Sequence, residues 1–301
     1  MAFLPLFRQR GRGGSGSRKL QAGDEPFCFG SLLYAATATN KHENQDGFAI
    51  FKTPGNNVFA VADGIGSFAY PAVASSEAIR YLETHCNELS ADRLELKMHF
   101  LAVQQRLAEL AQTDFRDENP ERLLGTTLIV GVESEDKVTF AYVGNGAILH
   151  LRGTLPQFAD ADDSWYAANL LSPHTVPEKG REALYGFLSN GAGAGEPQPT
   201  RIEVDKDPRR GDVFVICTDG IFSADPQEAY RTPKIGLLYK FDDRLAGLLR
   251  HLREYAAGRS FGPQSLKECI DCYLAECKPS LADDSTLAVV VTGAFIRNNS
   301  L

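Results

Sequence analysis

The chain has 301 residues, is 43% hydrophobic and 23% charged, and carries a formal net charge of −8 at pH 7. This composition supports a large buried core and excludes a chain that is disordered throughout. The excess of acidic residues argues against a general nucleic-acid-binding protein, which needs a basic face. No stretch reaches the roughly 18 consecutive apolar residues of a membrane-spanning helix, so no transmembrane segment is predicted.

The basic residues gather at the start of the chain. Residues 1–23 hold five basic and no acidic residues, together with a run of Gly and Ser. No apolar stretch follows these charges, as it would in a signal peptide. Without an export signal the six cysteines are expected to be reduced thiols. We therefore predict a disordered basic tail over residues 1–24 and a cytoplasmic location; a solvated tail is favoured over one that touches an acidic membrane surface or partner.

Strand and helix patterns alternate irregularly along the rest of the chain. Strands are expected at 27–39, 47–51 and 57–62, then amphipathic helices at 72–86 and 91–112, then strands at 127–132, 138–143 and 147–151. An irregular flap follows at about 152–199, then strands at 201–204 and 213–217, helices at 226–231, 243–256 and 263–277, and a strand at 285–291.

This order is not a repeated β-α-β unit. It predicts an α+β fold, a four-layer α/β/β/α sandwich of two antiparallel sheets with flanking helix pairs. We expect one domain over residues 25–296 and a short tail at 297–301. Cys269, Cys272 and Cys277 have a metal-like spacing, but no fourth Cys or His follows closely. Buried thiols on one helix face are therefore favoured over a zinc site.

Four aspartates lie at the ends of predicted strands. Asp46 precedes one strand and Asp283 precedes the last, whereas Asp63 and Asp219 each end a strand in an Asp-Gly pair. A single Asp-Gly pair usually marks only a turn. Four carboxylates gathered on one rim of a sandwich would repel one another, and divalent cations resolve that conflict. Oxygen ligands favour magnesium, manganese or calcium over zinc or copper.

The ordered set of motifs resembles the metal-dependent protein phosphatases, the type 2C serine/threonine phosphatases, in their bacterial form. Each motif is weak alone, but together they run in family order over about residues 27–292. The matching stretches are Asn44 to Phe48, Val61 to Gly66, Gly125 to Leu128, Val143-Gly144, Gly211-Asp212, Ile216 to Gly220 and Asp283 to Thr286.

The resemblance implies a binuclear manganese or magnesium centre. Asp63 would bridge both ions, the Gly64 carbonyl and Asp46 would serve one, and Asp219 and Asp283 the other. The implied reaction is hydrolysis of phosphoserine or phosphothreonine by a metal-activated water, with no phosphoenzyme. Phosphorylated proteins would be the substrates, and a cognate serine/threonine kinase would be the opposing partner.

Two positions depart from the family pattern. Lys41 stands where an arginine usually grips the substrate phosphate, and a lysine cannot make the planar bidentate contact. We expect weaker phosphate binding, with a solvated surface lysine as the alternative. Asn145 stands where many bacterial members have an aspartate of a third metal site, and an amide is a poorer ligand, which puts a third ion in doubt. These departures keep a second hypothesis open: a pseudophosphatase acting as a regulatory or protein-binding module.

Overall fold

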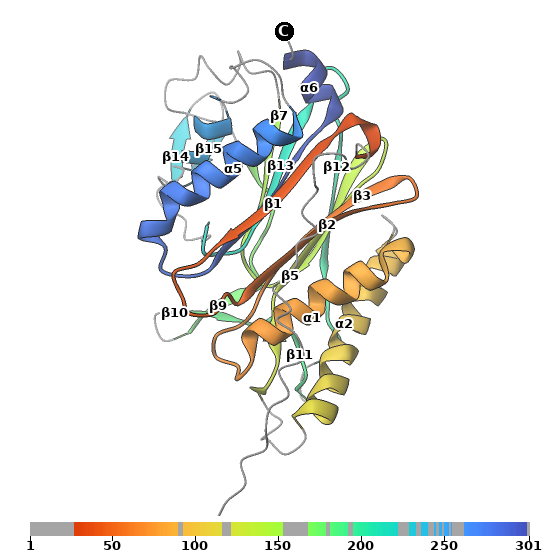
Figure 1. The fold of residues 1–301 in the computed structure, drawn as a ribbon, viewed down its shortest axis with the longest axis vertical. Coiled ribbons are helices and arrows are strands. Elements are labelled where there is room, and N and C mark those ends of the chain that lie inside the picture. The colour runs from red at the N-terminus through yellow and green to blue at the C-terminus, as the bar shows by residue number, and fades with distance from the viewer. Residues whose placement is uncertain are drawn as a thin grey trace, which may run out of the picture.

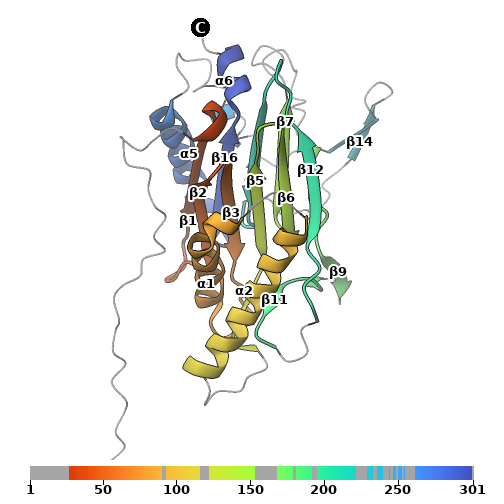
Figure 2. The same cartoon turned by 90° about the vertical axis from the view of Figure 1, so that its right-hand side faces the viewer.

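Two five-stranded antiparallel sheets pack face to face, and helices cover their outer faces (Figure 1, Figure 2). The structure is a computed structural model. It describes residues 27–89, 93–115, 122–152, 168–178, 181–191, 195–221, 229–232, 236–239 and 262–299, and positions 244, 247, 248, 250, 251, 252 and 254. The predicted basic tail over residues 1–24 lies outside the described residues.

The first sheet has the strand order β1-β16-β13-β7-β8. Its strands are β1 (Leu32–Ala38), β16 (Ser285–Val291), β13 (Asp212–Cys217), β7 (Ala147–Arg152) and β8 (Ala168–Asn169). The second sheet has the order β12-β6-β5-β3-β2. Its strands are β12 (Thr200–Asp205), β6 (Lys137–Val143), β5 (Leu128–Glu133), β3 (Asn56–Asp63) and β2 (Asp46–Thr53).

Strand β16 is covered on both faces, by the other sheet on one side and by helices on the other. All seven of its residues are buried. Ala288 and Val290 join the apolar cluster between the sheets, whereas Leu287 and Val289 join the cluster under the helices. A strand covered on both faces needs apolar residues at consecutive positions rather than at alternate ones. The unbroken apolar run near the end of the sequence therefore marks a central strand.

Helices α1 (Pro71–Thr84) and α2 (Arg93–Asp114) cover the second sheet, and α5 (Pro263–Cys277) lies across the first. The described positions between 244 and 254 are also helical, and Leu248 and Leu252 pack into the same cluster as α5. These layers confirm the predicted α/β/β/α sandwich. Among the cysteines of α5, Cys269 is buried as expected, but Cys272 is exposed and Cys277 is half-buried, so the expectation of buried thiols holds only for Cys269. No described helix combines the length and the apolar character needed to pass through a bilayer.

Three segments differ from the expected elements. The helix expected at 226–231 is wrong over its described part, residues 229–231, where β14 (Ala229–Thr232) pairs with β15 (Gly236–Tyr239); residues 226–228 lie outside the described residues. A helix of six residues is marginal on its own, so pairing with a partner strand decides the conformation. The described parts of the flap contain β9 (Thr175–Glu178), β10 (Arg181–Leu184) and β11 (Leu188–Ser189), which pairs with β4 (Gly125–Thr126). Helix α6 (Gly293–Asn299) runs past residue 296, where a C-terminal tail was expected.

Candidate metal centre

The strand register places the four predicted aspartates at one end of the sandwich. Asp46 lies directly opposite Asp63 in the β2–β3 ladder. Asp219 follows β13 and Asp283 precedes β16, and these two strands are hydrogen-bonded neighbours. Burial raises the pKa of Asp63 well above its usual range, and repulsion from Asp46, Asp219 and Asp283 raises it further. The structure thus brings together four carboxyl groups that lie far apart in the sequence.

Asp46 is the most deeply buried member of this group, with 2% of its surface exposed. Its Oδ2 accepts a hydrogen bond of 2.8 Å from the Thr218 hydroxyl. Its Oδ1 is buried and receives no hydrogen bond. Burial raises the pKa of Asp46 to about 7, although the hydrogen bond from Thr218 opposes that shift. A buried carboxylate oxygen with no donor is costly unless a cation or a proton meets it.

The backbone around Asp63 is held from a neighbouring segment. The Asp63 carbonyl accepts hydrogen bonds from the Thr127 amide at 2.8 Å and from the Thr126 hydroxyl at 2.9 Å. The Gly64 amide donates to the Gln45 carbonyl at 3.0 Å. From sequence alone, Gly125-Thr126-Thr127 is expected only to pack between sheets, because nothing local shows that it contacts a carboxylate-bearing turn. In the structure it fixes the end of β3.

Two glycines permit close approach at the site. A Cβ on Gly64 would lie 2.3 Å from the Pro71 carbonyl oxygen, and one on Gly220 would lie 1.8 Å from the Asp284 carbonyl oxygen. Either contact is far inside van der Waals range, so only glycine fits. The Asp-Gly pairs are therefore more than turn signals, because each glycine lets its aspartate pack against another segment of the site.

Asn145 contacts the metal-ligand candidate Asp219. Its side-chain amide donates a hydrogen bond of 2.6 Å to Asp219 Oδ2. Burial raises the pKa of Asp219, repulsion from Asp283 adds to the shift, and this hydrogen bond opposes it. Arg244 supports the same turn, since its guanidinium donates to the Gly220 carbonyl at 2.6 Å. Sequence analysis missed Arg244, because a single arginine on an amphipathic helix is normally a solvated residue.

Lys41 is held by acidic groups and is not a freely solvated lysine. Its ammonium forms an ion pair with Asp283 and lies 3.4 Å from Asp284 Oδ2. It also donates to Gln45 Oε1 at 3.2 Å. Partial burial lowers the pKa of Lys41, but the hydrogen bond to Asp283 and the charges of both aspartates outweigh it, so the pKa is raised. Asp284, which sequence analysis did not single out, is 2% exposed.

The chemical type of these ligands fits a hard divalent cation, but the present positions of their side chains do not yet form a metal site. Among the described residues, no three His, Cys, Asp or Glu side chains form a group that could already hold a metal ion. Lys41 and Asn145 each occupy a carboxylate oxygen, and Asp46 and Asp63 interact directly with each other. The orphaned Asp46 oxygen and the all-oxygen chemistry still fit manganese or magnesium, because these ions prefer carboxylate and carbonyl ligands. Carboxylate side chains reorient readily around a cation, so the chemistry of the donor set decides whether the site fits the metal.

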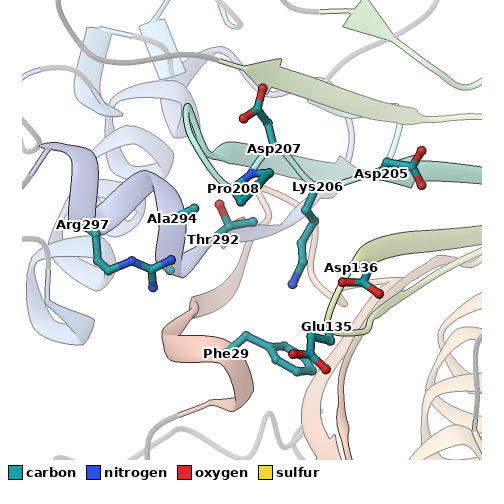
Figure 3. A pocket seen from close by; sticks show the side chains of 11 residues that line it. Phe29, Glu135, Asp136, Asp205, Lys206, Asp207, Pro208, Thr292, Ala294 and Arg297 are labelled. Carbon is teal, nitrogen blue, oxygen red and sulfur yellow. The ribbon is translucent and has the colours of Figure 1, made fainter.

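A separate cavity of about 470 Å³ lies at the opposite end of the sandwich, and Figure 3 shows the side chains that line it. It is lined by Phe29, Lys206 and Arg297, among others, and by none of the four aspartates. Strands of six to eight residues separate the two ends, a span of roughly 20 Å. The cavity is therefore separate from the candidate metal centre.

Similar structures share this fold. Serine/threonine phosphatase Stp1 from Staphylococcus aureus is 13% identical with a TM-score of 0.60, covering 90% of this chain and 99% of that one. The Mycobacterium tuberculosis serine/threonine phosphatase PstP/Ppp is 18% identical with a TM-score of 0.55, covering 87% and 98%. The PstP catalytic domain in complex with two manganese ions is 20% identical with a TM-score of 0.54, covering 87% and 97%.

A search of the curated protein sequences finds no match. The sequence does match a family model, however. Residues 35–271, well over half of the chain, match the model described as protein phosphatase 2C. The matched range contains Asp46, Asp63 and Asp219. The chain therefore belongs to the protein phosphatase 2C family of serine/threonine phosphatases.

Proposed function

We propose that this chain is an active, metal-dependent phosphatase that hydrolyses phosphoserine and phosphothreonine in proteins. Its metal ligands would be Asp46, Asp63, the Gly64 carbonyl, Asp219 and Asp283. One observation carries the proposal: a buried Asp46 oxygen without a donor lies beside Asp63 on a rim where four carboxyl groups converge. A protein that only binds a partner would gain nothing from burying carboxyl groups that repel one another, which lowers its stability.

The environment of each ligand supports its role. Asp63 interacts with Asp46 as well as with Asp219 and Asp283, which suits a residue shared by two cations. Asp46 has one oxygen fixed by Thr218 and one left for a cation. When bound, two manganese or magnesium ions lower the pKa of water and neutralise charge on phosphoryl oxygens.

The remaining groups act around these ligands. Thr218 orients Asp46, and the amide of Asn145 orients Asp219. Lys41 supplies a positive charge at the rim for the substrate phosphate. A third ion is not part of the proposal, because Asn145 brings an N–H donor to Asp219 where a further ion would need an acceptor. The reaction would take place in one catalytic domain that begins at about residue 25 and includes α6, in the cytoplasm, opposing a serine/threonine kinase.

Manganese-dependent hydrolysis of p-nitrophenyl phosphate and of a phosphothreonine peptide tests the proposal. Asp63→Asn and Asp219→Asn remove one charge each with little change of shape, and we expect kcat/KM to fall by about a hundredfold or more. Asp136→Asn is the matched control, since this exposed aspartate lies by the distant cavity. A wild-type protein that turns over neither substrate with any divalent metal would favour the pseudophosphatase, a regulatory or protein-binding module.

A further inference from the structure

The Lys41 ammonium has three hydrogen-bond donors and meets three oxygen acceptors. These are Asp283 Oδ1, Asp284 Oδ2 at 3.4 Å and Gln45 Oε1 at 3.2 Å. The match in number means that the ammonium is fully coordinated by the protein. Two of the three acceptors are carboxylates, so one positive charge faces two negative charges. The remaining negative charge attracts a second cation.

The two aspartates differ in their freedom to move. The Asp284 side chain is 1% exposed. Its oxygens accept hydrogen bonds from the Thr39 hydroxyl and, at 2.9 Å, from the Gln45 backbone amide. The Asp283 side chain is 54% exposed, and its Oδ1 accepts from Lys41 and, at 2.8 Å, from the Asp284 backbone amide. A divalent cation can therefore reach Asp283 from solvent, whereas Asp284 stays fixed beside Lys41.

We propose that Lys41 competes with a divalent cation for the Asp283 carboxylate, and that Asp284 keeps the displaced ammonium at the rim, where it meets the substrate phosphate. This inference rests on the proposed function, because it takes Asp283 to be a metal ligand. A dication outcompetes an ammonium for a carboxylate because its charge is doubled. The Lys41 backbone amide donates to Thr39 Oγ1 at 2.9 Å, which fixes the Lys41 backbone at the rim, and Asp284 Oδ2 remains as the acceptor that keeps the displaced ammonium nearby. Lys41 thereby links cation binding to phosphate binding.

Manganese titration by calorimetry without substrate separates this role from simple phosphate binding. Lys41→Met removes the competing charge and keeps an unbranched side chain, so we expect the weaker manganese step to tighten about three- to tenfold. Lys278→Met is the charge-matched control. Lys278 is exposed and its carbonyl accepts from Asn40 Nδ2, so it lies near the same rim, and we expect less than about a twofold change.

A second measurement uses the wild-type protein. Amine-reactive labelling followed by mass spectrometry reports how available each lysine is. Manganese should raise the labelling of Lys41 and leave that of Lys278 unchanged. Unchanged manganese affinity in Lys41→Met would overturn the inference. The same holds if the extent of Lys41 labelling is equal with and without manganese. A wild-type protein that binds no manganese would instead overturn the proposed function, so the two failures are distinguishable.

Discussion

Asp46 and Asp63 face each other across the last rung of the β2–β3 ladder, with Asp46 almost fully buried. Strand pairing therefore holds two carboxyl groups together before any ligand binds. Burial raises the pKa of Asp46 to about 7 and that of Asp63 well above its ordinary value. The fold thus holds two mutually repelling carboxyl groups at the position where we propose that the metal ions bind.

The raised pKa of Asp46 predicts that the metal-stripped protein loses stability as pH rises. The folded carboxyl keeps its proton up to about pH 7, whereas the unfolded carboxyl loses it near 3.8. The stabilisation is complete below pH 3.8 and is lost as pH rises through 7, with a slope on the order of 1.4 kcal/mol per pH unit. Melting temperatures in EDTA should fall between pH 5 and pH 8.

Asp46→Asn is the control for that pH dependence. The amide does not ionise, so the variant should show a flatter curve and should melt above the wild type at pH 8 in EDTA. Manganese should raise the melting temperature of the wild type at pH 8 and have a smaller effect on the variant. Parallel curves for the two proteins would show that Asp46 does not carry the pH dependence.

The contact between Asn145 and Asp219 predicts the number of metal ions. Asn145→Asp replaces an N–H donor by a carboxylate that faces Asp219, which creates an all-oxygen pocket. Manganese stoichiometry by calorimetry should rise from two to three, and anomalous scattering should show the added ion beside residue 145. Asn145→Ala removes the hydrogen bond without adding a ligand and should keep two ions. A wild-type crystal with a full third manganese beside Asn145 would contradict this account.

The close approach of Gly220 to Asp284 predicts a strong effect of one methyl group. In Gly220→Ala the new Cβ would lie 1.8 Å from the Asp284 carbonyl oxygen, so the turn that carries Asp219 must move. We expect a loss of about 2–4 kcal/mol in the free energy of unfolding and a large loss of activity. Gly195→Ala, where the Cβ meets nothing within 4 Å, should change neither by much. Urea unfolding and phosphatase assays measure both effects.

The sequence predicts the local parts of this site better than the long-range ones. Asp46 and Asp63 belong to one hairpin, which is closed by the two-residue turn Pro54-Gly55, so the short connection between two apolar runs largely determines their pairing. The Lys41–Asp283 ion pair joins residues 242 positions apart, and no local pattern encodes it. The resemblance places Lys41 as a phosphate contact, but only the assembled rim shows that it also binds a metal-ligand candidate.

Errors in the predicted elements have a similar origin. At residues 229–231 the pairing of Ala229–Thr232 with Gly236–Tyr239 outweighs the local preference for a helix. Helix α6 was missed because its formation depends on packing: Phe295 lies against Gly211, where a Cβ would come within 2.1 Å of the Phe295 amide nitrogen. Composition near the chain end gives no sign of that contact.

Lys206 and Glu133 form a buried ion pair by the distant cavity. Glu133 is fully buried and accepts from Lys206 at 3.1 Å, from Ser31 at 2.7 Å and from Asn57 at 2.7 Å. The Lys206 ammonium also lies 4.3 Å from the centre of the Phe29 ring (Figure 3). Lys206→Met leaves Glu133 charged and without its cation, so the free energy of unfolding should fall by about 3–5 kcal/mol.

Adding Glu133→Gln to Lys206→Met removes the uncompensated charge, keeps an oxygen acceptor for Asn57 Nδ2, and places an amide NH2 that can donate to the Ser31 hydroxyl. We expect urea unfolding to show that this double variant recovers much of the lost stability. Phosphatase activity per folded molecule should match the wild type in both variants, because the pair lies at the opposite end of the sandwich from the aspartates. A double variant less stable than Lys206→Met would show that the buried negative charge is not the cause.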